Sequence, residues 1–478
     1  MQQKLAMGES VDEEHKWMTK FVRELKKEGF IAAPMIAVTV LQYLQQLVSM
    51  VIVGHLDQLS LSSVAIAISL TNVTGFSLLS GMAGGLETLC GQAFGAEQYQ
   101  KLGTYTCTAI MSLILVCPPV CVLWIFMDKL LPLVGQDPLI SLEARKYSMW
   151  LIPALFGASI LKPLTRYFQS QSLIFPMLLS SFVILLFHIC ASWALVYKLG
   201  SGSNGSAIAF SLSTWLYVVM LGSYAIFSSA FKKSRITISK DSIFHVGEFF
   251  RLATPSAVMV CLKWWSCELL VLLSGLLSNP KLEASVLSIC LTISTLHFNL
   301  SYGFGAAAST RVSNELGAGN PQAARVAVQA AIFLSVTEAL IVSTTLFCCR
   351  SILGRAFSNE KQVVDYVAVM APLICLSVFM DSLQGVLSGV ARGSGWQHMG
   401  AYVNLGAFYL VGLPLALVLG FPMHLRGKGL WIGIVVGSAV QSTLLACITY
   451  FTNWDKQAKL ARERICAERP SEDMESVE

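Results

Sequence analysis

The chain carries the sequence LETLCGQAFGA at residues 86–96 and the sequence STRVSNELGAG at residues 309–319. Each stretch follows a long apolar segment, and each places a threonine, an amide side chain and Gly-Ala at matching positions. With a shift of one residue, the alignment continues upstream and matches Pro34 with Pro255. The chain therefore has the pattern of an internal duplication. A repeat of this length, built from membrane-length apolar segments, is typical of secondary transporters, which place their substrate site between or within the related halves.

Composition places the chain in a membrane. Of its 478 residues, 55% are hydrophobic and 13% are charged, and the mean hydropathy is +0.64. Soluble globular proteins have about 25% charged residues. The apolar runs are continuous rather than alternating in polarity, which predicts an all-α membrane protein. Twelve runs reach the length of about 20 residues that a helix needs to cross a bilayer. They lie at 31–53, 61–83, 104–127, 141–161, 174–197, 206–230, 252–277, 284–308, 324–348, 363–386, 401–421 and 429–452.

These segments divide into two halves of six. Because six is even, both halves begin on the same side of the membrane, and the repeat predicts two six-helix bundles related by a pseudo-two-fold axis along the membrane normal. Tyr147 and Pro153 match Tyr366 and Pro372, which aligns the fourth segment with the tenth. The expected parts are a cytosolic N-terminal segment (1–30), an N-lobe (31–230), a cytosolic linker (231–251), a C-lobe (252–452) and a cytosolic C-terminal tail (453–478).

The distribution of positive charge predicts the orientation. Most of the 33 Lys and Arg residues fall in the N-terminal segment, the linker, the C-terminal tail and the connectors on that same side. Since positive residues mark the cytosolic side, both termini are expected in the cytosol. The exception is a basic connector on the outer side, with Arg350, Arg355 and Lys361. The outer connector between the fifth and sixth segments carries an acceptor pattern for N-glycosylation at Asn204-Gly205-Ser206.

Several function classes lack their sequence signals. No basic patch interleaved with aromatic residues suggests nucleic-acid binding, and no Cys and His spacing suggests a metal site. The chain contains no P-loop and no hydrolase motif, so the energy for transport must come from an ion gradient or from the gradient of the solute. His188 and His297 lie well inside segments without an obvious partner, and we interpret them as packing residues. No cofactor is expected.

Two acidic residues near segment centres are the candidate coupling sites. Glu268 and Asp381 are expensive to place in a membrane, at about 2.5–3.5 kcal/mol each on insertion scales. A buried carboxyl group has a raised pKa and can exchange protons near neutral pH. The alternative is an ion pair that only fixes helix packing, with Lys263 as the partner of Glu268. The spacing of five residues disfavours that pair, because it puts the two side chains about 140° apart on a helix.

Polar stripes surround these acids. Trp264 lies one helical turn before Glu268, on the same face, and could seat a flat cationic solute beside the carboxylate. Two sets of polar residues at helical spacing predict a shared water-filled cavity in the C-lobe. One set is Ser377, Asp381, Gln384, Ser388 and Arg392, and the other is Ser288, Thr292, Thr295, Asn299 and Tyr302. For a single hydroxyl in these sets, helix packing is the simpler role.

The first half does not repeat the acids. In the register of the duplication, Glu268 corresponds to Leu47 and Asp381 to Lys162. Proton or cation coupling is therefore expected in the C-lobe.

The chain resembles the multidrug and toxic compound extrusion transporters, in particular their plant detoxification branch. The resemblance covers residues 25–455 and is carried by 86–96, by 309–319 and by GVLSGVARGSGWQ at 385–397. It implies two bundles that work as a rocker switch and a proton-coupled antiporter in the vacuolar or plasma membrane. The implied solutes are organic cations, alkaloids, flavonoid-type metabolites or xenobiotics, handled by a monomer. Glu268 and Asp381 match the acids that the family pattern places in the seventh and tenth helices.

Four alternatives remain open on the sequence. One is a flippase for lipid-linked precursors, which would need a cationic cavity, and another is an exporter coupled to Na⁺. A membrane-embedded enzyme would need a nucleophile or a His–acid pair at a segment end. A channel would need a filter-like loop, which the sequence does not suggest.

Overall fold

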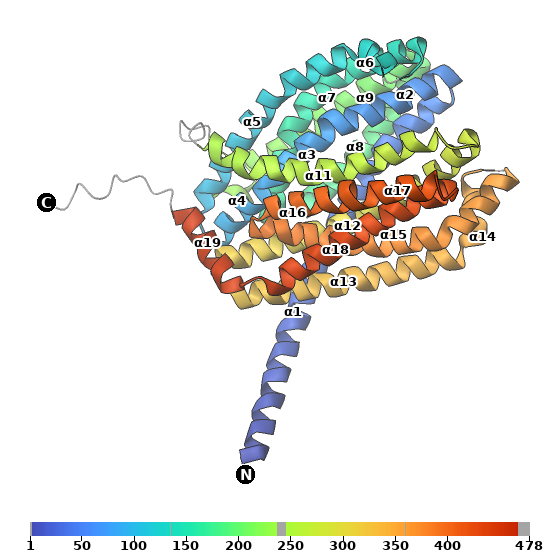
Figure 1. Ribbon diagram of the computed structural model, residues 1–478. Coiled ribbons are helices and arrows are strands. Elements are labelled where there is room, and N and C mark those ends of the chain that lie inside the picture. Colours follow the sequence, from blue (N-terminus) through green and yellow to red (C-terminus); the bar gives the residue numbers. More distant parts are fainter. Residues whose placement is uncertain (1, 134, 237–244, 359, 467–478) are drawn as a thin grey trace.

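The computed structural model describes residues 2–133, 135–236, 245–358 and 360–466, and these residues form a helical bundle of two lobes (Figure 1). Twelve helices of the described residues are long and apolar enough to cross a membrane, which confirms the expected all-α membrane class. The N-lobe consists of α1 (Gln2–Gly54), α2 (Gln58–Thr71), η1 (Asn72–Phe76), α3 (Ser77–Ala83), α4 (Gly85–Gly95), α5 (Tyr99–Ile125), α6 (Met127–Leu133), α7 (Pro138–Ser170), α8 (Phe175–Trp193), η2 (Ala194–Lys198), α9 (Gly202–Phe227) and η3 (Ser229–Phe231).

The C-lobe begins at α11 and repeats this order. It consists of α11 (Val246–Ser274), α12 (Pro280–Gly317), α13 (Pro321–Cys348), α14 (Arg350–Leu353), η4 (Gly354–Ala356), α15 (Lys361–Ser394), α16 (Gln397–Asn404), η5 (Leu405–Gly412), α17 (Leu413–Gly420) and α18 (Arg426–Phe451), followed by α19 (Trp454–Cys466). Much of the expected linker and the last part of the expected tail, 237–244 and 467–478, lie outside the described residues.

Several helices are longer than their apolar segments, and their longest extensions lie on the same side. The segment expected at 61–83 continues to Gly95, and the one expected at 141–161 continues to Ser170. In the C-lobe, the corresponding ends are Gly317 and Ser394. Hydropathy ends a segment where polar residues begin, whereas a helix continues as long as its backbone groups stay paired. The polar ends of these helices are therefore part of the packed structure.

Within the described residues, π-helical turns interrupt two of the spanning helices, at η1 and η5, and end a third at η2. In η1, Asn72–Phe76 form a π-helix between α2 and α3, and Trp124 of α5 donates its Nε1 hydrogen to Thr74 Oγ1 at 2.9 Å. A Cβ atom at Gly75 would lie 2.5 Å from the Trp124 ring, so glycine lets the two helices approach. Such π-turns are frequent at functional sites. Here η1 points Asn72, Val73 and Phe76 into the space between the lobes.

The lobes meet through the two repeated stretches. A side chain at Gly95 of α4 would collide with the carbonyl of Asn314 on α12, and one at Gly317 of α12 would collide with the carbonyl of Gln92 on α4. The contact is thus reciprocal, with the same repeat positions on both sides. We call the end of the molecule that contains α4, the last turns of α12 and α15, and α19 the closed end.

Two further elements cross between the lobes at the closed end. Residues 15–28 of α1 pack on the C-lobe, where Arg311 of α12 pairs with Glu24 and the Phe21 ring lies 5.9 Å from the Phe333 ring. Helix α19 contacts both lobes, since Arg464 donates to Gln92 Oε1 at 2.6 Å and Arg462 donates to the Ala318 carbonyl at 3.3 Å. The start of α1 projects away from the bundle (Figure 1).

Candidate functional site

A cavity of about 500 Å³ lies between the lobes. Its walls come from α1, α2, η1, α3, α7 and α9 on the N-lobe side and from α11, α12 and α15 on the C-lobe side. Arg166 and Arg392 form its floor toward the closed end, and Gln46 and Met50 lie toward the opposite end. Cavities of about 300–1,000 Å³ hold drug-sized solutes. We call this space the main cavity.

Most of the site residues expected from the sequence line the main cavity. Thr292 is placed elsewhere: it lines neither this cavity nor the smaller one described next, and its hydroxyl donates to the Ser288 carbonyl at 2.9 Å. The expected residues on the wall of the main cavity are Lys263, Trp264, Glu268, Thr295, Asn299, Tyr302, Gln384, Ser388 and Arg392.

A second cavity of about 120 Å³ lies inside the C-lobe. It brings together Glu268 from α11, Asp381 and Ser377 from α15, and Trp431 from α18. Glu268 lines both cavities, whereas Asp381 lines only the smaller one. The two acids expected to act together therefore share one compartment, and only one of them reaches the space between the lobes.

Glu268 contacts the other lobe directly. Ser69 of α2 donates to Glu268 Oε2 at 2.7 Å, and this is the one hydrogen bond that the carboxylate makes within the described residues. Beside it, the Trp264 and Phe298 rings lie edge to face with their centroids 5.3 Å apart. The site thus combines a carboxylate free of a basic partner with an aromatic wall, an arrangement that suits a cation.

Asp381 is held differently. Lys263 of α11 donates to Asp381 Oδ1 at 2.8 Å and to Ser438 Oγ at 3.1 Å, and both ion-pair side chains are about one-tenth exposed. The basic partner foreseen for Glu268 therefore pairs with the other acid, in line with the poor helical spacing between Lys263 and Glu268. One turn earlier on α15, Ser377 accepts from Trp431 Nε1 at 2.9 Å.

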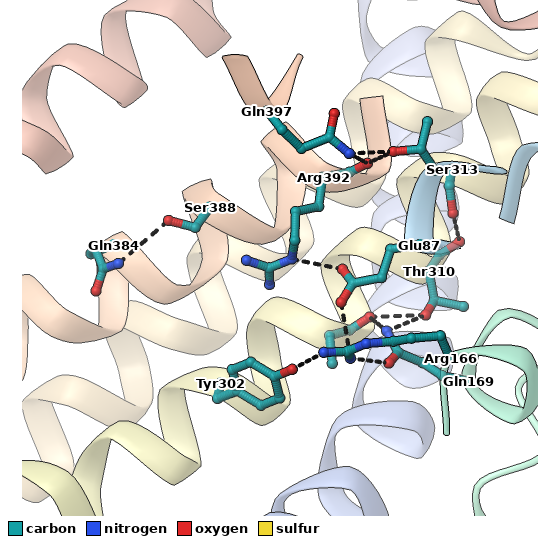
Figure 2. Close-up of polar contacts among 12 residues, drawn as sticks. Glu87, Arg166, Gln169, Tyr302, Thr310, Ser313, Gln384, Ser388, Arg392 and Gln397 are labelled. Carbon is teal, nitrogen blue, oxygen red and sulfur yellow. Dashed lines mark hydrogen bonds and ion pairs between the residues drawn. The ribbon is translucent and has the colours of Figure 1, made fainter. Parts of the chain in front are cut away.

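The floor of the main cavity is a buried charge network that joins the lobes (Figure 2). Glu87 of α4 accepts from Arg392 Nε at 2.8 Å and pairs with Arg166 of α7 at 2.9 Å. Arg166 also donates to the Tyr302 hydroxyl, and both guanidinium groups lie over the Tyr302 ring, 5.5 Å from its centroid for Arg166 and 5.9 Å for Arg392. Arg392, the basic residue of the polar stripe expected in the C-lobe, pairs with an acid of the other lobe.

Amide and hydroxyl side chains extend this network toward α19. Thr88 donates to the Arg392 carbonyl and accepts from Gln397 Nε2, the latter at 2.6 Å. Gln92 donates to the Gly393 carbonyl at 3.1 Å. On the α7 side, Gln169 donates to the Ala306 carbonyl at 3.1 Å. All these contacts join residues of one lobe to residues of the other.

Sequence reasoning missed Glu87 and Arg166 because both lie beyond the ends of their apolar segments. The signal was present, since Glu87 is an acid inside a repeated stretch of otherwise small and apolar residues. The expectation that acids of the site lie only in the C-lobe is therefore incomplete. Glu87 belongs to the network, although it does not line the main cavity.

The interpretation of both buried histidines as unpartnered was wrong. His188 binds the hydroxyls of Ser49 and Ser213 at 2.9 and 3.0 Å. His297 lies 3.2 Å from Glu338 of α13, which also accepts from Ser382 at 2.9 Å. Glu338 is thus a further carboxylate near the middle of a spanning helix, like Glu268 and Asp381. These partners come from distant helices, which spacing along the chain does not reveal.

On the N-lobe side, the repeat counterparts of the two C-lobe acids also reach the main cavity. Leu47 of α1 and Lys162 of α7 both line it. Within the described ranges, no group of three or more His, Cys, Asp or Glu side chains is arranged to hold a metal ion. Two helical lobes around a central cavity, joined at one end by a charge network, define a two-lobed membrane transporter.

Comparison with known proteins gives the family. The MatE family profile matches twice, at residues 34–194 and 255–418, once in each lobe. Protein DETOXIFICATION 8 of Arabidopsis thaliana is 55% identical over 448 residues, which is 94% of this chain and 92% of that protein. The crystal structure of the eukaryotic MATE transporter AtDTX14 superposes with a TM-score of 0.91 at 55% identity and covers 93% of this chain and all of that one.

The chain therefore belongs to the MATE family of multidrug and toxic compound extrusion transporters, and it is a transporter rather than an enzyme. A more distant structure, titled as the outward-facing conformation of a multidrug resistance MATE transporter, shares the fold with a TM-score of 0.81 at 15% identity. It covers 92% of this chain and 97% of its own. MATE transporters bind small organic solutes in the membrane.

Proposed function

We propose that the protein is a proton-coupled antiporter that exports amphipathic organic cations from the cytosol by a rocker-switch motion of its two lobes. The solutes would be alkaloids, flavonoid-type metabolites or xenobiotics that carry a positive charge. The protein would act as a monomer in the vacuolar or plasma membrane, with both termini and the closed end in the cytosol. Membership of the MATE family favours this exporter over the flippase alternative.

The observation that carries the proposal is the position of Glu268. Within the described residues, Glu268 is the only acid that lines the main cavity, and it accepts from the Ser69 hydroxyl rather than from a base. A cationic solute can therefore pair with the carboxylate without displacing a resident ion pair. The adjacent Trp264 ring supports this role, since cations are attracted to aromatic faces.

Exchange at Glu268 would couple the two fluxes. In the cytosol-facing state, the ionised carboxylate binds the cation. After the lobes move, a proton from the acidic outer or luminal side neutralises Glu268, the attraction is lost and the cation leaves. The protonated site returns and releases its proton to the cytosol. One proton thus enters for each monovalent cation exported at this site.

Asp381 would transmit this change within the C-lobe. Protonation of Asp381 removes the charge that holds Lys263, and this pair joins α15 to α11, the helix that carries Glu268. The second cavity connects the two acids. We therefore assign direct cation exchange to Glu268 and conformational coupling to Asp381.

Transport into proteoliposomes with an acidic interior tests these roles. The probe is radiolabelled tetraethylammonium, whose permanent charge prevents accumulation by protonation alone, and valinomycin with equal K⁺ clamps the membrane potential. The wild type should accumulate the probe, Glu268→Gln should abolish accumulation, and Asp381→Asn should reduce it at least tenfold. Glu97→Gln, which changes an exposed acid after α4, is the matched control.

Replacing the pH gradient by an inward-directed or outward-directed Na⁺ gradient separates the two coupling ions. Accumulation that follows Na⁺ and ignores pH would overturn proton coupling. Normal proton-driven accumulation in both Glu268→Gln and Asp381→Asn would overturn the assignment of the site.

A further inference from the structure

The N-lobe wall of the main cavity carries a positive charge without a partner. Lys162 and Arg166 lie one helical turn apart on α7, and both line the cavity. The Arg166 guanidinium is compensated by Glu87 at 2.9 Å. The Lys162 ammonium makes no hydrogen bond or ion pair with any residue that the structure describes.

The other charged side chains on the cavity wall each have an ion-pair partner. Arg392 shares the single carboxylate of Glu87 with Arg166, so the floor keeps one excess positive charge, and Lys263 is paired with Asp381. The charged residues that line the cavity within the described part of the chain are Lys162, Arg166, Lys263, Glu268 and Arg392. Two of them have no ion-pair partner among the described residues. These are Lys162 on the N-lobe wall and Glu268 on the C-lobe wall.

An unpaired ammonium inside a membrane is costly and calls for a functional explanation. A packing role does not explain Lys162, because helix packing in membranes uses small or hydrogen-bonded residues. The amides of Gln42, Gln46 and Asn72 lie on the same N-lobe side of the cavity. A wall that carries both an ammonium and amide hydrogens suits a carboxylate, which accepts hydrogen bonds and carries the opposite charge.

We infer that the main cavity selects bipolar solutes, in which an aromatic body joins a cationic group to a carboxylate. The carboxylate pairs with Lys162 on the N-lobe wall while the cationic group pairs with Glu268 on the C-lobe wall. The pairing of the cationic group with Glu268 rests on the proposed function, whereas the pairing of the carboxylate rests on Lys162 alone. Such a solute bridges the lobes with one ion pair to each.

Two matched dyes test the pairing of the solute carboxylate with Lys162. Rhodamine 110 carries a cationic xanthene and a free carboxylate, and rhodamine 123 is its methyl ester, which lacks the negative charge. Binding of each dye to the full-length protein in detergent is measured by fluorescence anisotropy, without any ion gradient. The wild type should bind rhodamine 110 about tenfold more tightly than rhodamine 123.

Variants at Lys162 locate the preference. Lys162→Gln should weaken binding of rhodamine 110 about tenfold and leave rhodamine 123 unchanged, and Lys162→Arg should keep the preference. Lys146→Gln, which changes an exposed lysine of the same helix, should alter neither dye. Size-exclusion profiles identify any variant that has lost its fold. If Lys162→Gln has done so, Lys162→Arg still tests whether a positive charge at this position is sufficient for the preference.

The inference is overturned if the wild type prefers the ester or binds neither dye, or if Lys162→Gln weakens both dyes equally. The proposed function is tested separately with tetraethylammonium, which carries no carboxylate. It fails if the wild type shows no pH-driven transport of that probe.

Discussion

At the closed end, Gly95 of one lobe packs on Asn314 of the other while Gly317 packs on Gln92, so equivalent residues make equivalent contacts. At the main cavity, equivalent residues differ: Lys162 stands on the N-lobe wall, and its counterpart Asp381 lies inside the C-lobe. The lobes are therefore alike in this glycine contact and different in the charged residues that face the cavity. The glycine contact uses features that the repeat preserves, whereas the charge network and the cavity walls use features that it does not.

The largest expected effect comes from the charge that joins the two lobes. Glu87→Gln leaves two buried guanidinium groups without their shared carboxylate, and breaking a buried pair in this way costs about 3–5 kcal/mol. The closed end should open, with faster amide hydrogen exchange in α4 and the last turns of α12, and tetraethylammonium transport should fall at least tenfold. The exposed control Glu97→Gln should leave hydrogen exchange in these helices unchanged. If Glu87→Gln also leaves it unchanged, the symmetric backbone contact alone closes the molecule.

The pair inside the C-lobe gives an intermediate effect. Asp381→Asn and Lys263→Met should each lower the thermal unfolding midpoint, since each leaves one member of a buried pair alone, at a cost of about 3 kcal/mol. The double variant should recover most of that stability, because removing both charges together is often neutral. Transport should stay low in the double variant if Asp381 couples protons. Recovery of both stability and transport would reduce Asp381 to a structural residue.

The smallest effect is expected from single methyl groups at the closed end. Gly95→Ala and Gly317→Ala each insert a carbon against a backbone carbonyl of the other lobe, and overpacking of this kind costs about 1–3 kcal/mol. Because the contact is reciprocal, both variants should raise hydrogen exchange at the closed end to a similar extent. Gly222→Ala, where an added carbon meets nothing within 4 Å, is the control. Tolerance of one alanine but not the other would contradict the symmetry.

The sequence was sufficient for the all-α class and the twelve spanning helices because long apolar runs have few other uses. It misjudged the ends of the helices, since hydropathy does not record that polar residues such as Glu87 and Arg166 can continue a helix when they find partners across the lobes. Those partners come from α12 and α15, more than a hundred residues away along the chain.

For the site, the chemistry of intramembrane acids identified Glu268 and Asp381 as candidates, and the structure separates them into two environments. Their pairing could not be predicted, because Lys263 lies close to Glu268 in sequence but bonds to Asp381 on another helix. The His297 and Glu338 contact was missed for the same reason. Spacing along one helix excludes partners reliably, whereas it identifies partners on other helices only when the packing is known.

The reciprocal contact of Gly95 and Gly317 has the form of an isologous interface, in which one patch binds its own copy around a two-fold axis. Two separate six-helix chains with this patch would assemble in the same way, but every substitution in such a dimer would appear on both walls of the cavity at once. A single chain of two lobes is free of that constraint. It can keep the shared patch and still carry a lysine on one wall of the cavity and a carboxylate on the other.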